Sequence, residues 1–315
     1  MFMAGKATTA PFLQVRVVAP RVLMMSAAAV FAAAVSSAPS SADTIDPFST
    51  SAPPTQMGPL LHTSKNWAGY TAETDFNSPV SDTVTAVSGS WIVPSVTTPV
   101  NSAARTLDCV AWVGIDGFSN NTVEQVGTES GIANGVAYYD AWFEMYPGSM
   151  WTSFDLSPGD SVTASVQYGL PSNPNQFQLA LTDNTSGRSF TIDQTNSSAL
   201  RSSAEWIVEA PKFAGAIEPL PAFGSVTFTN ASATIGSTTG AIDDPSWQVT
   251  EINMSNPATG DTMAPAALVT VGSGASASSS FGVYQTPEPS TLVMLATAAV
   301  GLGLRIFAVR QPLRN

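Results

Sequence analysis

Short apolar runs separated by turn-forming residues make up most of the chain. From Asn66 onward, Gly, Pro, Asn and Asp interrupt β-branched and aromatic runs about every ten residues, which is typical of an antiparallel sandwich or barrel. No amphipathic helical pattern occurs between the two ends. We therefore predict an all-β fold, a single large antiparallel sandwich of two packed sheets. The clearest predicted strands are Thr83–Val93, Cys109–Ile115, Val136–Tyr146, Ser161–Tyr168, Glu205–Val208, Ser225–Thr229 and Trp247–Ile252.

The N-terminal region has the pattern of an export signal. Residues 1–42 carry sparse positive charges, then the apolar run Val22–Val35, then small residues up to Ala42, the order found in secretory signal peptides. We expect a signal helix here. Residues 43–64 are polar and Pro-rich, which predicts a linker or short pro-segment with a solvated His62. The folded domain is predicted at 65–285.

A second apolar segment lies at the C-terminal end. Residues 286–315 contain Pro287-Glu288-Pro289, an apolar stretch from Leu292 to Leu304, and Arg305 with two further arginines. This order resembles a PEP-CTERM sorting tail, with a hydrophobic helix that is marginally long enough to span a membrane. The resemblance implies a bacterial protein exported to the cell envelope, cell surface or extracellular matrix, and an exosortase-like sorting enzyme as a partner. A plain C-terminal anchor is the alternative.

Alternation along three predicted strands puts carboxylates and aromatic rings on one face, because residues two apart in a strand share a face. Along 138–147 the opposite face has the composition of a core. Segments 111–117 and 204–209 divide in the same way. Acidic and aromatic residues together are typical of a cleft floor, although solvated sandwich faces also alternate. The residues on this face are Asp140, Trp142, Glu144, Tyr146, Trp112, Gly114, Asp116, Glu205, Ile207 and Glu209.

Composition limits the chemistry that the chain can perform. With one histidine, His62, and one cysteine, Cys109, it cannot form an internal disulfide or a cysteine zinc cluster, and only His62 could serve a Ser-His or Cys-His site. Residues 43–286 contain five basic and 22 acidic residues, a net charge of −17. Such a charge argues against nucleic acid as a partner. Self-repulsion would fall below about pH 4 to 5, so an acidic environment suits the chain, although acidity also confers solubility.

Six short motifs, in order along the chain, are similar to those of the glutamic peptidases, also called eqolisins. The resemblance implies a concanavalin-like sandwich of two antiparallel sheets that hydrolyses peptide bonds at acidic pH without metal or cofactor. The motifs are Asn66-Trp-Ala-Gly-Tyr70, Trp112-Val-Gly-Ile-Asp-Gly117, Gln125-Val-Gly-Thr128, Tyr139-Asp-Ala-Trp-Phe-Glu-Met-Tyr-Pro147, Ala204-Glu-Trp-Ile-Val-Glu209 and Phe223-Gly-Ser-Val-Thr-Phe-Thr-Asn230.

The resemblance implies a catalytic dyad of Gln125 and Glu209. Glu209 would take a proton from water, and the Gln125 amide would stabilise the oxyanion. Glu205 shares the face of Glu209 and is the competing glutamate; the resemblance favours Glu209. Glu129 stands where the family has Asp. We expect polypeptide substrates and a monomer. The implied substrate-binding residues are Trp67, Trp112, Asp116, Asp140, Trp142, Glu144 and Tyr146.

Two other classes of function suit an acidic and aromatic cleft. A surface glycoside hydrolase would use Asp140 and Glu144, but four residues along one strand separate their Cα atoms by about 13 Å, which is awkward for a carboxyl pair. A non-catalytic carbohydrate-binding or matrix module would fit the sorting tail and would need no dyad.

Overall fold

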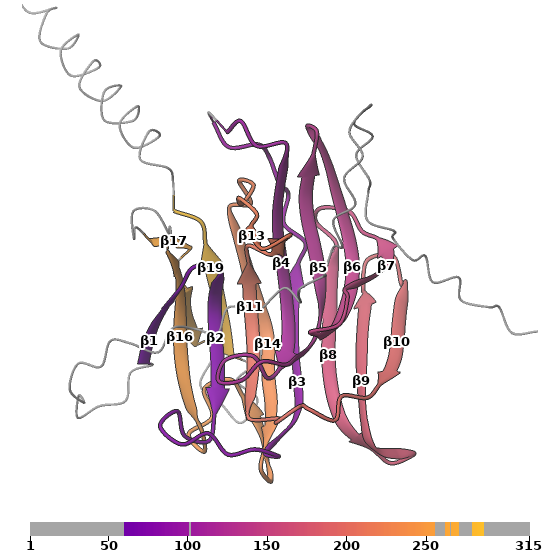
Figure 1. Cartoon of the computed structure of the whole chain (residues 1–315), viewed down its shortest axis with the longest axis vertical. Helices are drawn as coiled ribbons and strands as arrows, with labels where there is room; N and C mark the ends of the chain where they lie inside the picture. The colour runs from indigo at the N-terminus through magenta and orange to yellow at the C-terminus, as the bar shows by residue number, and fades with distance from the viewer. Residues whose placement is uncertain (1–59, 101, 256–261, 265, 271–278, 287–315) are drawn as a thin grey trace, which may run out of the picture.

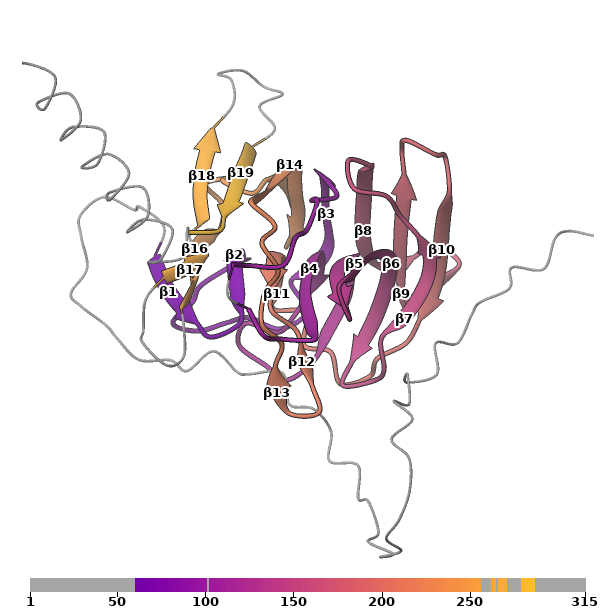
Figure 2. The ribbon, with the colours of Figure 1, turned by 90° about the horizontal axis from the view of Figure 1, so that it is seen from above.

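Two large antiparallel sheets lie face to face, as Figures 1 and 2 show. This computed structural model describes residues 60–100, 102–255, 262–264, 266–270 and 279–286. Within these ranges all the regular elements are strands, and no helix there is long and apolar enough to cross a membrane. The predicted sandwich is confirmed, whereas the signal helix and the hydrophobic tail lie outside the described residues.

The first sheet has nine strands in the order β1-β16-β2-β11-β4-β5-β6-β7, with β17 added to β16. All its pairs are antiparallel except β1 with β16. Its strands are β1 Leu60–Ser64, β2 Trp67–Glu73, β4 Thr106–Ile115, β5 Val123–Ala133, β6 Val136–Tyr146, β7 Trp151–Asp155, β11 Ser203–Glu209, β16 Gln248–Ser255 and β17 Thr262–Ala264.

The second sheet has eight strands in the order β10-β9-β8-β3-β14-β19-β18, with β15 on β14. A small hairpin of β12 and β13 follows β11 and projects beyond the first sheet in Figure 2. The hairpin strands are β12 Lys212–Phe213 and β13 Ala216–Ile217. The strands of the second sheet are β3 Val84–Ile92, β8 Ser161–Leu170, β9 Asn173–Asp183, β10 Ser189–Gln194, β14 Ser225–Ile235, β15 Thr238–Ala241, β18 Ala266–Thr270 and β19 Ser279–Tyr284.

Large aromatic side chains fill the space between the sheets. Phe281 of β19 stacks on Phe228 with ring centroids 5.0 Å apart and meets Tyr70 of the first sheet edge-on at 4.8 Å. The indole of Trp206 donates to the carbonyl oxygen of Ser88 across the layers at 2.8 Å. Burying such rings contributes most of the hydrophobic free energy of a sandwich, and the indole bond leaves no polar atom of Trp206 unsatisfied.

The structure corrects the prediction for His62. Instead of a solvated linker residue, it belongs to strand β1 and packs edge-on against Phe118, with ring centroids 5.1 Å apart. Burial lowers its pKa. The strand was missed because it lies at a sheet edge and is built on backbone pairing with β16, a pairing that leaves no alternating apolar signal in the sequence.

Phe281→Ala should destabilise the sandwich by about 3–5 kcal/mol, because it removes a fully buried ring that contacts both sheets. Urea unfolding followed by tryptophan fluorescence measures this. Val136→Ala, at a position 70% exposed, is the control and should change stability by less than about 0.5 kcal/mol. Equal effects of the two substitutions would contradict the placement of β19 in the core.

Candidate active site

The predicted sorting of side chains between two faces is confirmed by strand register. In an antiparallel pair, directly opposite residues share a face. Glu209 lies opposite Trp67, and Gln125 lies opposite Glu144, so the two parts of the proposed dyad lie on the outer face of the nine-stranded sheet. The residues assigned to the core in 138–147 do pack on the core: Ala141 is part of it, and Tyr139, Phe143 and Met145 pack against it.

A small apolar cluster covers this outer face. We call it the outer-face cluster. The ring of Trp112 lies against Gly114, where a Cβ atom would approach ring carbon Cζ3 to 2.9 Å, whereas a Cβ at Gly127 would come within 2.6 Å of the Trp112 Cβ. Glycine at 114 therefore makes room for the indole, and glycine at 127 allows the close approach of the two strands. The cluster consists of Trp67, Val110, Trp112, Val123, Trp142, Tyr146, Ile207 and Ile252.

The carboxylate of Glu209 is held by neutral donors at both oxygens. Asn66 Nδ2 donates to Oε1 at 3.2 Å, and Trp112 Nε1 donates to Oε2 at 3.0 Å. The rings of Trp67 and Trp112 meet edge-on at 5.1 Å beside it. Burial raises the pKa of Glu209 to about 7, while hydrogen bonds from Trp112, Trp67 and Asn66 and the charge of Lys212 lower it. Glu209 is thus a desolvated carboxyl group that protonates near neutral pH.

The amide of Gln125 is fixed at one end and unpaired at the other. Its Nε2 donates to Glu144 Oε2 at 2.8 Å, whereas its buried Oε1 has no partner. Burial, and then the negative charge of Glu209, raise the pKa of Glu144 to about 8, and the hydrogen bond from Gln125 lowers it. Since Glu144 senses the charge of Glu209, the three side chains form one electrostatic group.

A second set of carboxyl groups is buried beneath the loop that follows β4. Glu205 is fully buried; its Oε1 accepts from Phe118 N at 2.7 Å and Ser203 Oγ at 2.9 Å, and its Oε2 has no partner. Burial raises its pKa well above the ordinary value. Glu73 accepts from Ser119 Oγ at 2.9 Å, and burial raises its pKa to about 7. Glu205 is therefore enclosed, unlike the partly exposed Glu209.

Asp116 anchors this loop. Its carboxylate accepts from the backbone nitrogens of Arg201 at 2.7 Å and Ser202 at 2.8 Å, and from Asn120 Nδ2 at 2.7 Å. The residue is fully buried with a φ of 70°, a backbone conformation that Asp adopts more readily than most residues. These bonds hold the Asp116 carboxylate in place, and the expected substrate contact of Asp116 stays a prediction.

The remaining predicted residues lie along β6. Trp142 and Tyr146 belong to the outer-face cluster, and the indole nitrogen of Trp142 is buried without a partner. Asp140 is half-buried opposite Glu129, whereas Glu144 is bonded to Gln125. The two carboxyl groups proposed for a glycoside hydrolase therefore have separate environments, which argues against a shared sugar site.

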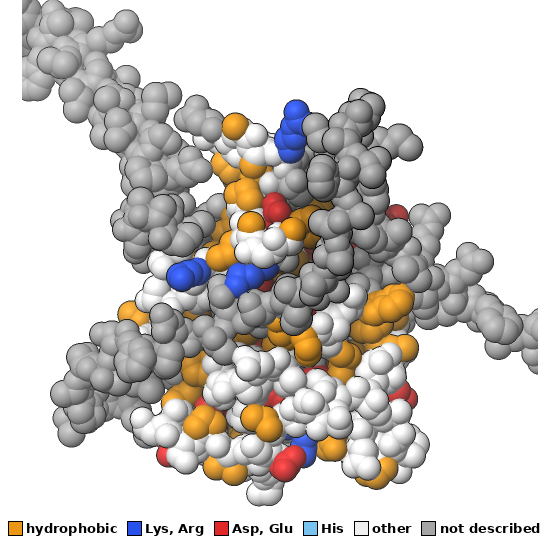
Figure 3. All heavy atoms as spheres, viewed as in Figure 1, with side chains coloured by type: hydrophobic (Ala, Val, Ile, Leu, Met, Phe, Trp, Pro, Cys, Tyr) orange, Lys and Arg blue, Asp and Glu red, His pale blue; other side chains and the backbone are white. Residues whose placement is uncertain are grey.

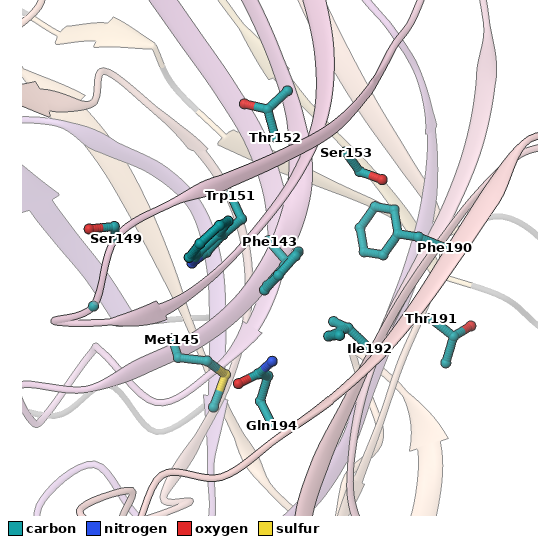
Figure 4. Close-up of a pocket in the computed structure, with 11 residues that line it drawn as sticks. Phe143, Met145, Ser149, Trp151, Thr152, Ser153, Phe190, Thr191, Ile192 and Gln194 are labelled. Carbon is teal, nitrogen blue, oxygen red and sulfur yellow. The ribbon is translucent and has the colours of Figure 1, made fainter. Parts of the chain in front are cut away.

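An apolar cavity of about 330 Å³ lies behind β6, on the face opposite Glu144. Figure 4 shows the rings of Phe143, Trp151 and Phe190 around it. Gly148 and Ser149, with the start of β7, form part of its wall. The cavity is thus separated from Gln125 and Glu209 by strand β6.

Charge around the candidate site is negative, and basic side chains appear as a few separate groups on the face in Figure 3. Among the described residues, no group of three or more His, Cys, Asp or Glu side chains is placed to hold a metal ion. What the outer face offers is instead a carboxyl group, an amide and two indoles in a desolvated setting. A carboxyl group can transfer protons, and an amide N–H can stabilise an oxyanion.

The family model described as Peptidase A4 family matches residues 65–273, and the chain belongs to this family.

Two relatives agree with this assignment, and a solved structure agrees with the fold. The chain is 31% identical over 194 residues to Aspergillopepsin-2 of Aspergillus niger, a match covering 56% of this chain and 66% of that protein, just under two thirds of its length. It is 30% identical to Scytalidopepsin B of Scytalidium lignicola, covering 61% and 71%. The fold is similar to that of Scytalido-glutamic peptidase bound to a peptide-based transition-state analogue, with a TM-score of 0.54, 24% identity, and coverage of 70% and 98%.

Sequence reasoning missed two side chains of the site. Asn66 lay in a recognised motif but was given no role, and Ser64 was assigned to a linker. Strand register places Asn66 at the site, because Asn66 precedes Trp67, which is paired with Glu209. Ser64 reaches the site through its hydrogen bond to Asn66. The only available signal was the position of Asn66 next to Trp67.

The buried carboxyl groups predict that the fold loses stability as pH rises. The folded-state pKa of Glu73, about 7, lies above its ordinary value of 4.5. Its contribution is therefore complete below about pH 4 and disappears as pH rises through about 7, a change on the order of 3 kcal/mol. Urea unfolding at pH 4 and pH 8 should show a smaller loss for Glu73→Gln than for wild type. Asp193→Asn, at an exposed site, should leave the loss unchanged; an unchanged loss in Glu73→Gln would contradict the prediction.

Proposed function

We propose that this protein is an exported endopeptidase that hydrolyses polypeptides through Gln125 and Glu209, without a metal ion. The observation that carries the proposal is the Glu209 carboxylate, held by neutral donors on the same sheet face as an amide whose oxygen has no partner. Glu144, to which that amide donates, interacts with the charge of Glu209. Glu205 supplies no equivalent group, since it is enclosed by the loop after β4. Export and sorting of the tail rest on the sequence of the two ends.

The first step uses Glu209 as a general base. Its carboxylate accepts a proton from a water molecule while the water oxygen attacks the scissile carbonyl carbon. The free Oε1 of Gln125 is an acceptor suited to the second hydrogen of that water. The carbonyl π-electron pair moves to oxygen and produces a tetrahedral oxyanion.

The second step uses both groups again. An amide nitrogen carries two hydrogens; Gln125 gives one to Glu144, and the other is available to the oxyanion. Collapse of the intermediate breaks the C–N bond, and Glu209 returns its proton to the leaving amine. The products are a free carboxyl group and a free amine, and the enzyme is regenerated. The indoles of Trp67 and Trp112 exclude water from the carboxylate, which strengthens the donors around it.

Replacing either dyad residue should abolish most activity. With unfolded polypeptide as substrate, Glu209→Gln should lower kcat/KM by about 10² to 10⁴, and Gln125→Ala by about 10² to 10³. Glu205→Gln is the matched control in the same strand and should remain within about threefold of wild type, since Glu205 is protonated in acid. Full activity of Glu209→Gln would refute the mechanism. A wild-type protein inert towards peptides would refute the function itself.

Activity should have a bell-shaped pH dependence with its maximum on the acid side of neutrality or close to pH 7. Below the pKa of Glu209, about 7, the ionised fraction falls about tenfold per pH unit. Above it, ionisation of buried carboxyl groups such as Glu73 weakens the fold. Initial rates between pH 3 and pH 9, with the folded fraction measured alongside, test this. A rate independent of pH below 6 would show that the ionised Glu209 is not the base.

A further inference from the structure

We propose that Asn66, oriented by Ser64, is a positioning residue that fixes the rotamer of Glu209 and favours its ionised form. This inference rests on the proposed function, because it assigns a role in the same reaction. Asn66 does not belong to the dyad, and its contacts leave the attacking water and the substrate to Gln125 and Glu209.

Asn66 forms hydrogen bonds with Glu209 and with the residue that follows it. Its side-chain Nδ2 donates to Glu209 Oε1 at 3.2 Å, and its backbone carbonyl accepts from the nitrogen of Ala210, the next residue in the chain, at 2.8 Å. Asn66 is only 2% exposed. The backbone contact anchors the end of β11, so the side-chain contact acts on a carboxylate whose Cα is already fixed.

Ser64 determines which end of the Asn66 amide faces Glu209. Its Oγ donates to Asn66 Oδ1 at 3.2 Å and accepts from the backbone nitrogens of Asn66 at 3.3 Å and Trp67 at 3.1 Å. With the amide oxygen occupied by Ser64, the NH₂ group is left for the carboxylate. Ser64 is itself buried, at 7% exposure.

The neutral donors leave room on Glu209 for a water molecule. A carboxylate has about four lone-pair sites on its two oxygens. Asn66 takes one on Oε1, Trp112 takes one on Oε2, and Trp67 takes a third, so one site remains for a water molecule. Donors of this kind favour the charged form without cancelling its charge, and the basicity needed to take a proton is kept.

Other groups also influence Glu209. Glu144 of β6 and the buried Cys109 thiol of β4 both interact with its charge, and Lys212 of β12 opposes the effect of burial. These three groups act on Glu209 through charge, whereas Asn66 holds the carboxylate through a hydrogen bond. Asn66→Ala leaves all three in place and isolates the contribution of the amide.

Asn66→Ala should raise the pKa of Glu209 and lower kcat. The lost bond to a charged group corresponds to about a ten- to hundredfold fall in kcat/KM at pH 5, with most of the fall in kcat because Asn66 does not touch substrate. Ser64→Ala should change both quantities in the same direction by less. Thr63→Ala, an exposed neighbour in β1, is the matched control and should match wild type in both.

The experiment combines kinetics with a direct titration of Glu209 by carbon-13 NMR of labelled glutamate, assigned through Glu209→Gln. Thermal unfolding of each variant is measured alongside to separate positioning from stability. A rise in the Glu209 pKa in Asn66→Ala, with kcat reduced and KM unchanged, supports the proposal. Wild-type values of kcat and pKa in Asn66→Ala overturn it while leaving the proposed function intact.

If wild type is inert towards peptides, the proposed function fails, and the titration alone still decides whether Asn66 favours the ionised form of Glu209. A fall in kcat that follows the folded fraction, with no change in the pKa of Glu209, overturns the positioning role in favour of a structural one.

Discussion

Desolvation of Glu209 is the constraint on which the candidate site depends. Indole rings and the outer-face cluster exclude water from the carboxylate, which raises its pKa to about 7. The donors at its oxygens, Asn66 and Trp112, are neutral, so the electrostatic cost of burying the charge is reduced but not removed. A cationic donor in their place would hold the carboxylate ionised at the expense of its basicity. A carboxyl group that both takes and returns a proton requires this intermediate condition.

Burial of a carboxyl group on the outer face of a sheet is possible because neighbouring residues are small. Gly114 and Gly127 lie beside Trp112, and a Cβ at Gly127 would also come within 2.3 Å of the carbonyl oxygen of Ala111. The indole can therefore pack over Gly114 and still direct its nitrogen to Glu209. Glycine weakens strands in general, and here that cost is offset by packing of the outer-face cluster on the same strands. The position of the Trp112 indole beside Glu209 therefore depends on glycine in the neighbouring strands.

The fold and the face of the candidate site could be predicted from sequence, because strand alternation has a period of two and needs no knowledge of neighbours. Alternation placed Asp140, Trp142, Glu144 and Tyr146 together, as found. It could not predict the hydrogen bonds that bury Asp116, since their donors, Arg201 and Ser202, are distant in sequence. It also could not connect Asn66 with Glu209, which are 143 residues apart in sequence and meet only through the pairing of β2 with β11. Strand β1 was missed for the same reason: its pairing with β16 is not local.

The same burial that makes Glu209 a base limits the pH range in which the protein can work. Glu73, Glu205 and Glu144 lie on the same sheet face and are also desolvated, so they also bind protons more tightly in the folded state. Their ionisation destabilises the fold in the pH range in which ionisation of Glu209 favours catalysis. Removing one buried carboxyl group would widen the stable range without helping the reaction. Lowering the pKa of Glu209 through better donors would move the reaction away from the unstable range, but it would weaken the base. The neutral amide of Asn66, oriented by Ser64, is an intermediate solution that the sandwich builds from the end of β1 and the bend that leads into β2.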